Sequence, residues 1–103
     1  MNPKPFLELD RVIHEKGRLP IVSLLAASTE LSFTELRDTL KMTDGNLSMH
    51  IKTLQEAGFV SVTKSFQDRR PLTTCALTAA GRKAFANYID LLEEIVRQAR
   101  GPK

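Results

Sequence analysis

The chain has 103 residues, of which 42% are hydrophobic and 26% charged, so we expect one globular domain with a single modest core rather than a disordered segment. The net charge is only +3, and the lone cysteine, Cys75, excludes an internal disulfide and fits a reducing cytoplasm. The sequence has no apolar run of bilayer length, no metal-ligand cluster and no nucleophile–base spacing, so we expect no membrane partner, no metal, no cofactor and no enzymatic activity.

The first quarter of the chain predicts two short helices. Pro3 and Pro5 favour an extended start, and apolar residues at helical spacing then predict a helix over about residues 6–14. Gly17 interrupts this pattern, and Pro20 suits the first turn of a second helix over about 18–28. The apolar residues of the first helix are Leu7, Leu9, Val12 and Ile13.

A third helix follows a brief connector. Residues 30–32 form this connector or a minimal strand, and Ser32 with Glu35 makes a capping box, in which each side chain bonds the backbone N–H of the other residue. The box predicts a helix that begins at Phe33. Its buried stripe consists of Phe33, Leu36 and Leu40.

A fourth helix, over about 43–57, follows after a tight turn. Thr43 is its N-cap and Gly58 its left-handed terminator. One stripe of this helix is apolar and must be buried: Leu47, Ile51 and Leu54. The opposite face is short, polar or singly basic: Asn46, Ser48, Met49, Lys52 and Thr53. Two helices joined in this way predict a helix-turn-helix whose second helix contacts a partner, and the hairpin that follows favours DNA.

After Gly58 the sequence pattern changes to that of strands. Residues 59–66 and 72–77 are rich in β-branched and aromatic residues, and residues 67–71 contain turn formers. We therefore predict a hairpin over about 59–77, with Arg69 and Arg70 at its tip. Positive charge gathers in the segment 52–83, which carries six basic side chains against two acidic ones: Lys52, Lys64, Arg69, Arg70, Arg82 and Lys83 against Glu56 and Asp68.

Thr78 caps a last helix that extends to about residue 99. Its apolar residues recur at spacings of three and four, over a length that exceeds what one small core needs. We interpret the stripe as both core and dimer seam, shared with the helix at 6–14. The expected dimer contacts are Leu7, Phe85, Tyr88, Ile89, Leu92, Ile95 and Val96.

The order of these elements resembles that of the short MarR/ArsR-like winged-helix transcriptional regulators. The stretches that carry the resemblance are 13–15, 18–19, 33–36, 43–48, 54–60, 69–71 and 77–82. The chain departs from the family pattern at Met49, where relatives often have a small polar residue, and at Cys75, where an aromatic residue is common. The resemblance implies an α+β, mainly α, winged helix-turn-helix fold over residues 1–103. It also implies a homodimer that places one recognition helix per protomer in successive major grooves.

In this fold the helix at 43–57 would read base edges. Asn46 and Ser48 suit direct or water-mediated hydrogen bonds, and Met49 suits a thymine methyl group. Thr34 is placed to bind a phosphate, and an arginine at the hairpin tip can enter the flanking minor groove. Arg82 adds a further expected phosphate contact. The expected DNA contacts are Thr34, Thr43, Asn46, Ser48, Met49, Lys52, Thr53, Lys64, Arg69 and Arg70.

Each of these side chains also has a simpler interpretation. Asn46 and Ser48 can be solvated residues of a first turn, and the paired arginines can solubilise the turn, with Asp68 holding one of them. Met49 can mark a protein contact instead. Two histidines favour structural roles, His50 as a packed or capping residue and His14 as a hydrogen-bonding partner within the fold. Cys75 fits a small buried thiol rather than a redox sensor.

The sequence thus predicts a sequence-specific regulator of double-stranded DNA, a homodimeric repressor that binds a pseudo-palindromic operator. The alternative is a winged-helix module for protein–protein interaction. That alternative predicts an acidic or apolar hairpin, whereas this hairpin is basic. No residue is diagnostic of a small-molecule effector, and its existence stays open.

Overall fold

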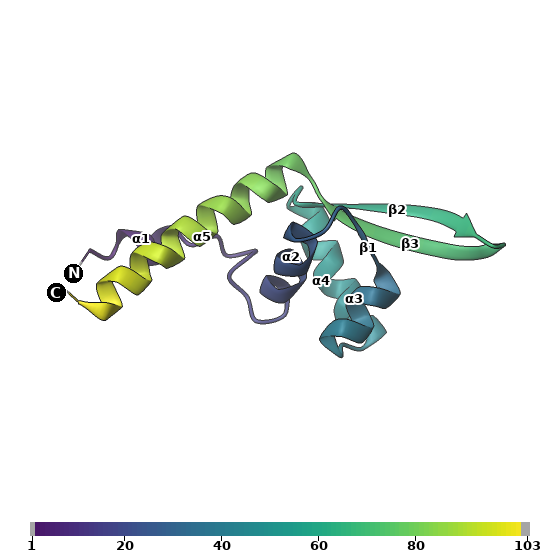
Figure 1. Ribbon diagram of the computed structural model, residues 1–103, viewed down its shortest axis with the longest axis horizontal. Helices are drawn as coiled ribbons and strands as arrows, with labels where there is room; N and C mark the ends of the chain where they lie inside the picture. Colours follow the sequence, from purple (N-terminus) through teal and green to yellow (C-terminus); the bar gives the residue numbers. More distant parts are fainter. Residues whose placement is uncertain (1, 102–103) are drawn as a thin grey trace.

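The computed structural model describes residues 2–101, and it confirms the α+β, mainly α, winged helix-turn-helix fold. Helices and strands follow one another from α1 at the N-terminus to α5 at the C-terminus (Figure 1). Their bounds are α1 Lys4–Glu8, α2 Arg18–Ala26, β1 Leu31–Ser32, α3 Phe33–Leu40, α4 Asp44–Glu56, β2 Val60–Gln67, β3 Arg70–Leu77 and α5 Ala79–Arg100.

The predicted helix starts are confirmed by their caps. The Ser32 side chain accepts from the backbone N–H of Glu35, and the Glu35 side chain accepts from the N–H of Ser32, which completes the capping box. Thr43 caps α4, and Thr78 caps α5 in the same manner. Gly58 has a φ of 82°, a conformation that glycine adopts without a steric penalty. Local side-chain chemistry therefore sets these helix boundaries.

The sheet is antiparallel and has the order β1-β3-β2. The minimal strand at 30–32 is confirmed as β1, which pairs with β3 through Leu31 and Ser32. The predicted five-residue turn at 67–71 is wrong, because the hairpin closes through Asp68 and Arg69 alone, with φ values of 51° and 68°. Two left-handed residues match the twist of the flanking strands, so pairing continues to the tip.

The N-terminal helix differs from the prediction in its bounds. Pro3 has helical backbone angles and Pro5 is buried in the first turn, so the expected extended start is wrong. Helix α1 ends at Glu8 instead of residue 14. The Asp10 carboxylate then accepts from the backbone N–H groups of Val12 and Ile13, and this local bonding replaces the helical pattern.

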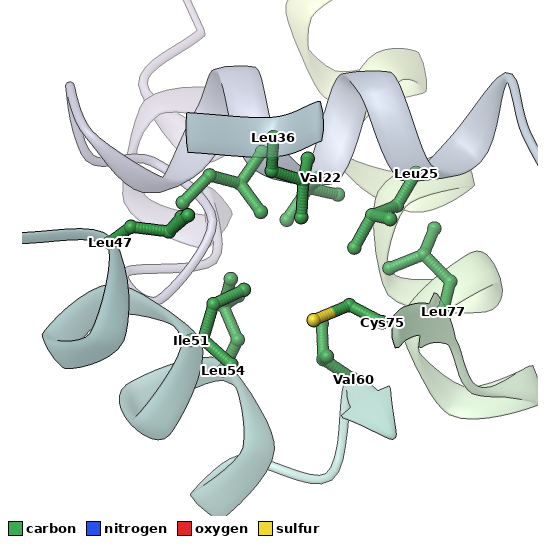
Figure 2. Close-up of a cluster of buried hydrophobic side chains, with 10 residues drawn as sticks. Val22, Leu25, Leu36, Leu47, Ile51, Leu54, Val60, Cys75 and Leu77 are labelled. Carbon is green, nitrogen blue, oxygen red and sulfur yellow. The ribbon is translucent and has the colours of Figure 1, made fainter. Parts of the chain in front are cut away.

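The core lies between the helix-turn-helix and the base of the hairpin. Figure 2 shows apolar side chains from α2, α3, α4, β2 and β3 that point toward one another. The predicted stripe of α4 is confirmed as part of this core, and the Cys75 thiol lies within it at 1% exposure. The buried cluster consists of Ile21, Val22, Leu25, Leu36, Leu47, Ile51, Leu54, Val60, Cys75 and Leu77.

The molecule is elongated, with principal extents of 59 × 26 × 21 Å. The hairpin of β2 and β3 projects from one end, whereas α1 lies along α5 at the other end (Figure 1). Within residues 2–101, no helix is both long and apolar enough to cross a membrane. The basic hairpin and the apolar terminal helices are therefore well separated surfaces.

Candidate nucleic-acid interface

Helix α4 turns its polar face to solvent. Its apolar stripe is anchored in the core, which leaves Asn46 and Ser48 exposed in the N-terminal half of the helix. Met49 is 56% exposed, which is unusual for a large apolar side chain. The three side chains are free to meet a partner that approaches this half of α4.

Two of the predicted contact threonines already have partners within the chain. The Thr43 hydroxyl accepts from the backbone N–H of Asn46 at 3.1 Å, and the Thr53 hydroxyl donates to the carbonyl of Met49 at 3.1 Å. Thr34 is exposed in the first turn of α3. A contact from Thr43 or Thr53 to DNA would have to be shared with these internal hydrogen bonds.

A groove separates α4 from the hairpin and brings two predicted contact residues together. It has a volume of about 340 Å³, and Lys52 of α4 and Lys64 of β2 lie on its two sides. Its lining consists of Phe33, Ser48, Ile51, Lys52, Gln55, Val62, Lys64 and Thr73. Two ammonium groups beside one groove favour a polyanion such as a phosphate backbone.

The arginines at the hairpin tip are exposed. Within residues 2–101, neither Arg69 nor Arg70 forms an ion pair, and Asp68 holds neither of them. The nearest ion pairs to α4 involve Arg37, which binds both Asp38 and Asp44 and so joins the end of α3 to the start of α4. Both guanidinium groups at the tip are available for a partner.

Arg82, an expected phosphate contact, already has partners within the chain. Its guanidinium donates to the backbone carbonyls of Ala26 and Ser28, at the C-terminal end of α2. Those carbonyls lack helical partners, so the cation satisfies them and complements the helix dipole. This role was missed because Arg82 and its acceptors are more than fifty residues apart in the sequence. No local pattern reveals it.

Two other residues fasten the same turn of α5. The Thr78 hydroxyl donates to the Gly58 carbonyl at 2.6 Å while it accepts from the Gly81 N–H. A Cβ atom on Gly81 would lie 2.2 Å from the carbonyl oxygen of Phe59, so only glycine fits there. Thr78, Gly81 and Arg82 form what we call the α5 clamp, which joins α5 to the ends of α2 and α4.

Both histidines have structural surroundings. His14 is hydrogen-bonded to the Tyr88 hydroxyl at 2.7 Å, which confirms its expected role within the fold. His50 packs against Gly17, where a Cβ atom would lie 2.3 Å from the ring Nε2. Next to Gly17, the Glu15 carboxylate caps the start of α2 by accepting from the backbone N–H groups of Arg18 and Gly17. These hydrogen bonds lower the pKa of Glu15.

The terminal helices carry an exposed apolar surface. Ile89 and Val96 of α5 are 38% and 45% exposed, and Leu7 of α1 is 80% exposed. Three more of the predicted dimer contacts, Phe85, Leu92 and Ile95, are half-buried. Tyr88 is only 1% exposed, so it supports this surface from within the protomer and has no area left to bury in a partner.

Cys75 and the carboxylates form no reactive or metal-binding group. Burial raises the pKa of the Cys75 thiol, so the uncharged and unreactive form is favoured. Within residues 2–101, no three His, Cys, Asp or Glu side chains lie close enough to hold a metal ion.

Comparisons with known proteins agree with this geometry. Residues 18–96 match the family model described as a winged helix DNA-binding domain. An uncharacterized protein of Methanocaldococcus jannaschii is 39% identical over 79 residues, which cover 77% of this chain and 86% of that protein. A transcriptional regulator homologue from Pyrococcus horikoshii OT3 superposes with a TM-score of 0.85 at 25% identity, over 90% of this chain and 94% of that chain.

Two further structures share the fold at lower identity. A MarR transcriptional regulator from Methanosarcina mazei Go1 has a TM-score of 0.68 at 23% identity, over 85% of this chain and 66% of that chain. The S. aureus MepR–DNA complex has a TM-score of 0.75 at 17% identity, over 94% of this chain and 79% of that chain.

Proposed function

The chain belongs to the winged helix DNA-binding domain family. We propose that it is a MarR-like transcriptional regulator, a homodimeric repressor that binds double-stranded DNA sequence-specifically in the cytoplasm. Regulators of this family are not enzymes, in agreement with the expectation from the sequence.

The observation that carries the proposal is the shared orientation of the polar face of α4 and the basic groove beside it. Asn46 and Ser48 are exposed on the helix, while Lys52 and Lys64 line the groove toward the hairpin. An α-helix fits the major groove of B-DNA, where short polar side chains reach base edges and flanking cations bind phosphates. The MepR structure with DNA supports the same use of this fold.

In this arrangement the two parts of the interface have separate tasks. The N-terminal half of α4 enters the major groove, where Asn46, Ser48 and Met49 read bases. The hairpin reaches the flanking minor groove, where Arg69 or Arg70 meets the negative potential of a narrow A·T stretch. Lys52, Lys64 and Thr34 position the protein on the backbone.

The exposed apolar surface of α1 and α5 supports the homodimer in this proposal. Two copies related by a twofold axis would bury Leu7, Ile89, Leu92 and Val96 against each other, and each copy would present one α4 to the DNA. The operator of such a dimer is a pseudo-palindrome. Its half-sites lie about one helical turn apart.

Selection of random duplex DNA by the purified protein tests the proposal. At ~150 mM salt, where non-specific binding is weak, we expect enrichment of a palindrome with half-sites about one turn apart. Absence of any enriched motif, with only weak and salt-sensitive binding, would contradict it. That result would favour the alternative, a winged helix used for protein–protein interaction.

Asn46→Ala is expected to change which bases are selected. The amide is exposed at the base-reading end of α4, and one lost base contact costs about 1–3 kcal/mol of discrimination at the position it reads. Repeating the selection with this variant measures the change. Asn87→Ala, the same substitution on an exposed residue of α5, should leave the motif intact. An unchanged motif with Asn46→Ala would exclude base reading by Asn46.

Arg70→Ala is expected to weaken DNA binding broadly, and most at sites with a narrow A·T minor groove beside the half-site. Loss of one cation close to the phosphates that border this groove reduces the slope of log affinity against log salt by about one. Titrations at several salt concentrations measure this slope. Arg100→Ala removes the same charge at the far end of α5 and should leave the slope unchanged. If both variants behave like the unmodified protein, the hairpin tip does not touch DNA.

A further inference from the structure

The hairpin carries an apolar side chain that the proposed function does not use. Phe66 of β2 is 76% exposed, although a phenylalanine ring on a soluble surface normally finds cover. The other large exposed hydrophobic residues lie on α1, α4 and α5: Phe6, Leu7, Met49, Ile89 and Val96. Apart from Phe6, they belong to the proposed dimer surface or to the polar face of α4. Within residues 2–101, Phe66 is the one such residue on the hairpin.

The strand register places Phe66 on the face of the hairpin that is turned toward α4. Alternate residues of a strand share a face, so Phe66 continues the row of Val62 and Lys64. Lys64 and its neighbour Thr73 on β3 line the groove beside α4. Phe66 is thus the outermost member of a row that begins at the recognition helix.

Pro71 makes this end of the row wholly apolar. It lies directly opposite Phe66 in the register and is exposed. Gln67 and Arg70 close the two-residue turn, so the next pair, Phe66 and Pro71, is the kind that exchanges no backbone hydrogen bonds. The missing N–H of Pro71 therefore costs the ladder nothing, and β1 pairs with β3 only at Thr74 and Cys75.

Basic residues flank this apolar end. Lys64 lies two residues before Phe66, and Arg69 and Arg70 follow at the turn, against the single carboxylate of Asp68. A surface of one ring between cations does not suit an apolar protein groove. It suits DNA, whose phosphates attract the cations and whose sugars and base edges are apolar enough to cover the ring.

We propose that Phe66 is a minor-groove wedge: its ring packs against the sugars beside each half-site and partly unstacks one base step. Pro71, directly opposite on β3, extends the apolar surface beside the ring. This inference rests on the proposed DNA binding and adds a contact that fixes the position of the hairpin. The wedge favours flexible pyrimidine–purine steps, because these unstack at the lowest cost. Phe66 thereby contributes to sequence preference outside the major groove.

The substitution Phe66→Trp tests the contact directly. The chain contains no tryptophan, so the introduced indole is the only one and reports on position 66 alone. The probe is an A·T-rich duplex of about 30 base pairs, or three helical turns. We expect strong quenching of its fluorescence, and protection from acrylamide, when this duplex is added. Ser65→Trp, one residue along on the opposite face, should change far less.

Phe66→Ala tests the contribution to binding. We expect the affinity for this duplex to fall about tenfold, in the range of one stacked aromatic contact. The salt slope should stay unchanged, since a neutral ring releases no counterions. This separates Phe66 from Arg70, whose loss lowers the slope. Ser65→Ala is the matched control on the other face of β2 and should bind normally.

The outcomes distinguish this inference from the function on which it rests. If the unmodified chain binds DNA while Phe66→Ala binds equally well and the indole of Phe66→Trp is not quenched, the wedge is wrong and the proposed function stands. If the unmodified chain binds no DNA, both are wrong. If Phe66→Ala instead changes the molar mass measured by light scattering without DNA, the ring is a contact between copies of the chain.

Discussion

Replacing Leu92 with lysine is expected to convert the protein to a monomer and to lower its affinity for a two-half-site operator at least about a hundredfold. Leu92 lies between Ile89 and Val96 on the apolar surface of α5. In a twofold dimer the substitution enters the interface twice, and two ammonium groups without partners would have to lose their hydration. Loss of the dimer also removes the gain from binding both half-sites at once, which is typically 10²–10⁴-fold.

Light scattering over a range of micromolar concentrations and DNA titration measure the two effects of Leu92→Lys. Asp90→Asn is the matched control, because it changes the charge of α5 by the same one unit at an exposed position that does not belong to the apolar surface around Leu92. It should leave both the dimer and the affinity intact. If the unmodified protein has a monomer mass at every concentration, the dimer proposal is wrong.

Replacing Gly81 with alanine is expected to lower the free energy of unfolding by about 2 kcal/mol, as overpacking of a tight site does. The new Cβ would lie 2.2 Å from the Phe59 carbonyl oxygen, and backbone cannot move aside as a side chain can. If α5 moved away from Phe59 to make room, the hydrogen bond from the Thr78 N–H to the same carbonyl, now 3.0 Å long, would be stretched. Urea unfolding at one fixed protein concentration measures the loss.

Gly45→Ala provides a control with the opposite sign. Gly45 lies in the first turn of α4, and a Cβ atom added there would meet nothing within 4 Å, so alanine should raise stability by up to about 1 kcal/mol through helix propensity. An unfolding free energy that Gly81→Ala leaves unchanged would show that α5 is not held against Phe59.

The parts of the fold that the sequence predicted are those that local chemistry determines. Thr43 and Gly58 fix the ends of α4 through their own hydroxyl group and φ angle, so neighbouring residues were sufficient to place the helix. The hairpin was predicted from alternation in the same way. The N-terminal helix was misplaced because the Asp10 side chain accepts hydrogen bonds from the backbone there, in place of a helical turn. The spacing of hydrophobic residues gives no sign of such a bond.

Features that depend on distant segments could not be predicted. The stripe on α5 looks uniform in the sequence, yet Tyr88 is covered by its own chain while Ile89 beside it is exposed. Which face is covered depends on where the N-terminal segment lies, as the bond from His14 to Tyr88 illustrates. The bonds from Arg82 to the carbonyls of Ala26 and Ser28 were missed for a similar reason, since these acceptors are distant in the sequence.

The α5 clamp couples the orientation of the last helix to that of the helix-turn-helix. Thr78, Gly81 and Arg82 fasten its first turn to the ends of α2 and α4, so α5 is joined tightly to α4, the proposed recognition helix. In the proposed dimer, a small change in the angle at which the two α5 helices cross would swing both recognition helices together. A stimulus at the far end of α5 would then release the operator without touching any residue that binds it.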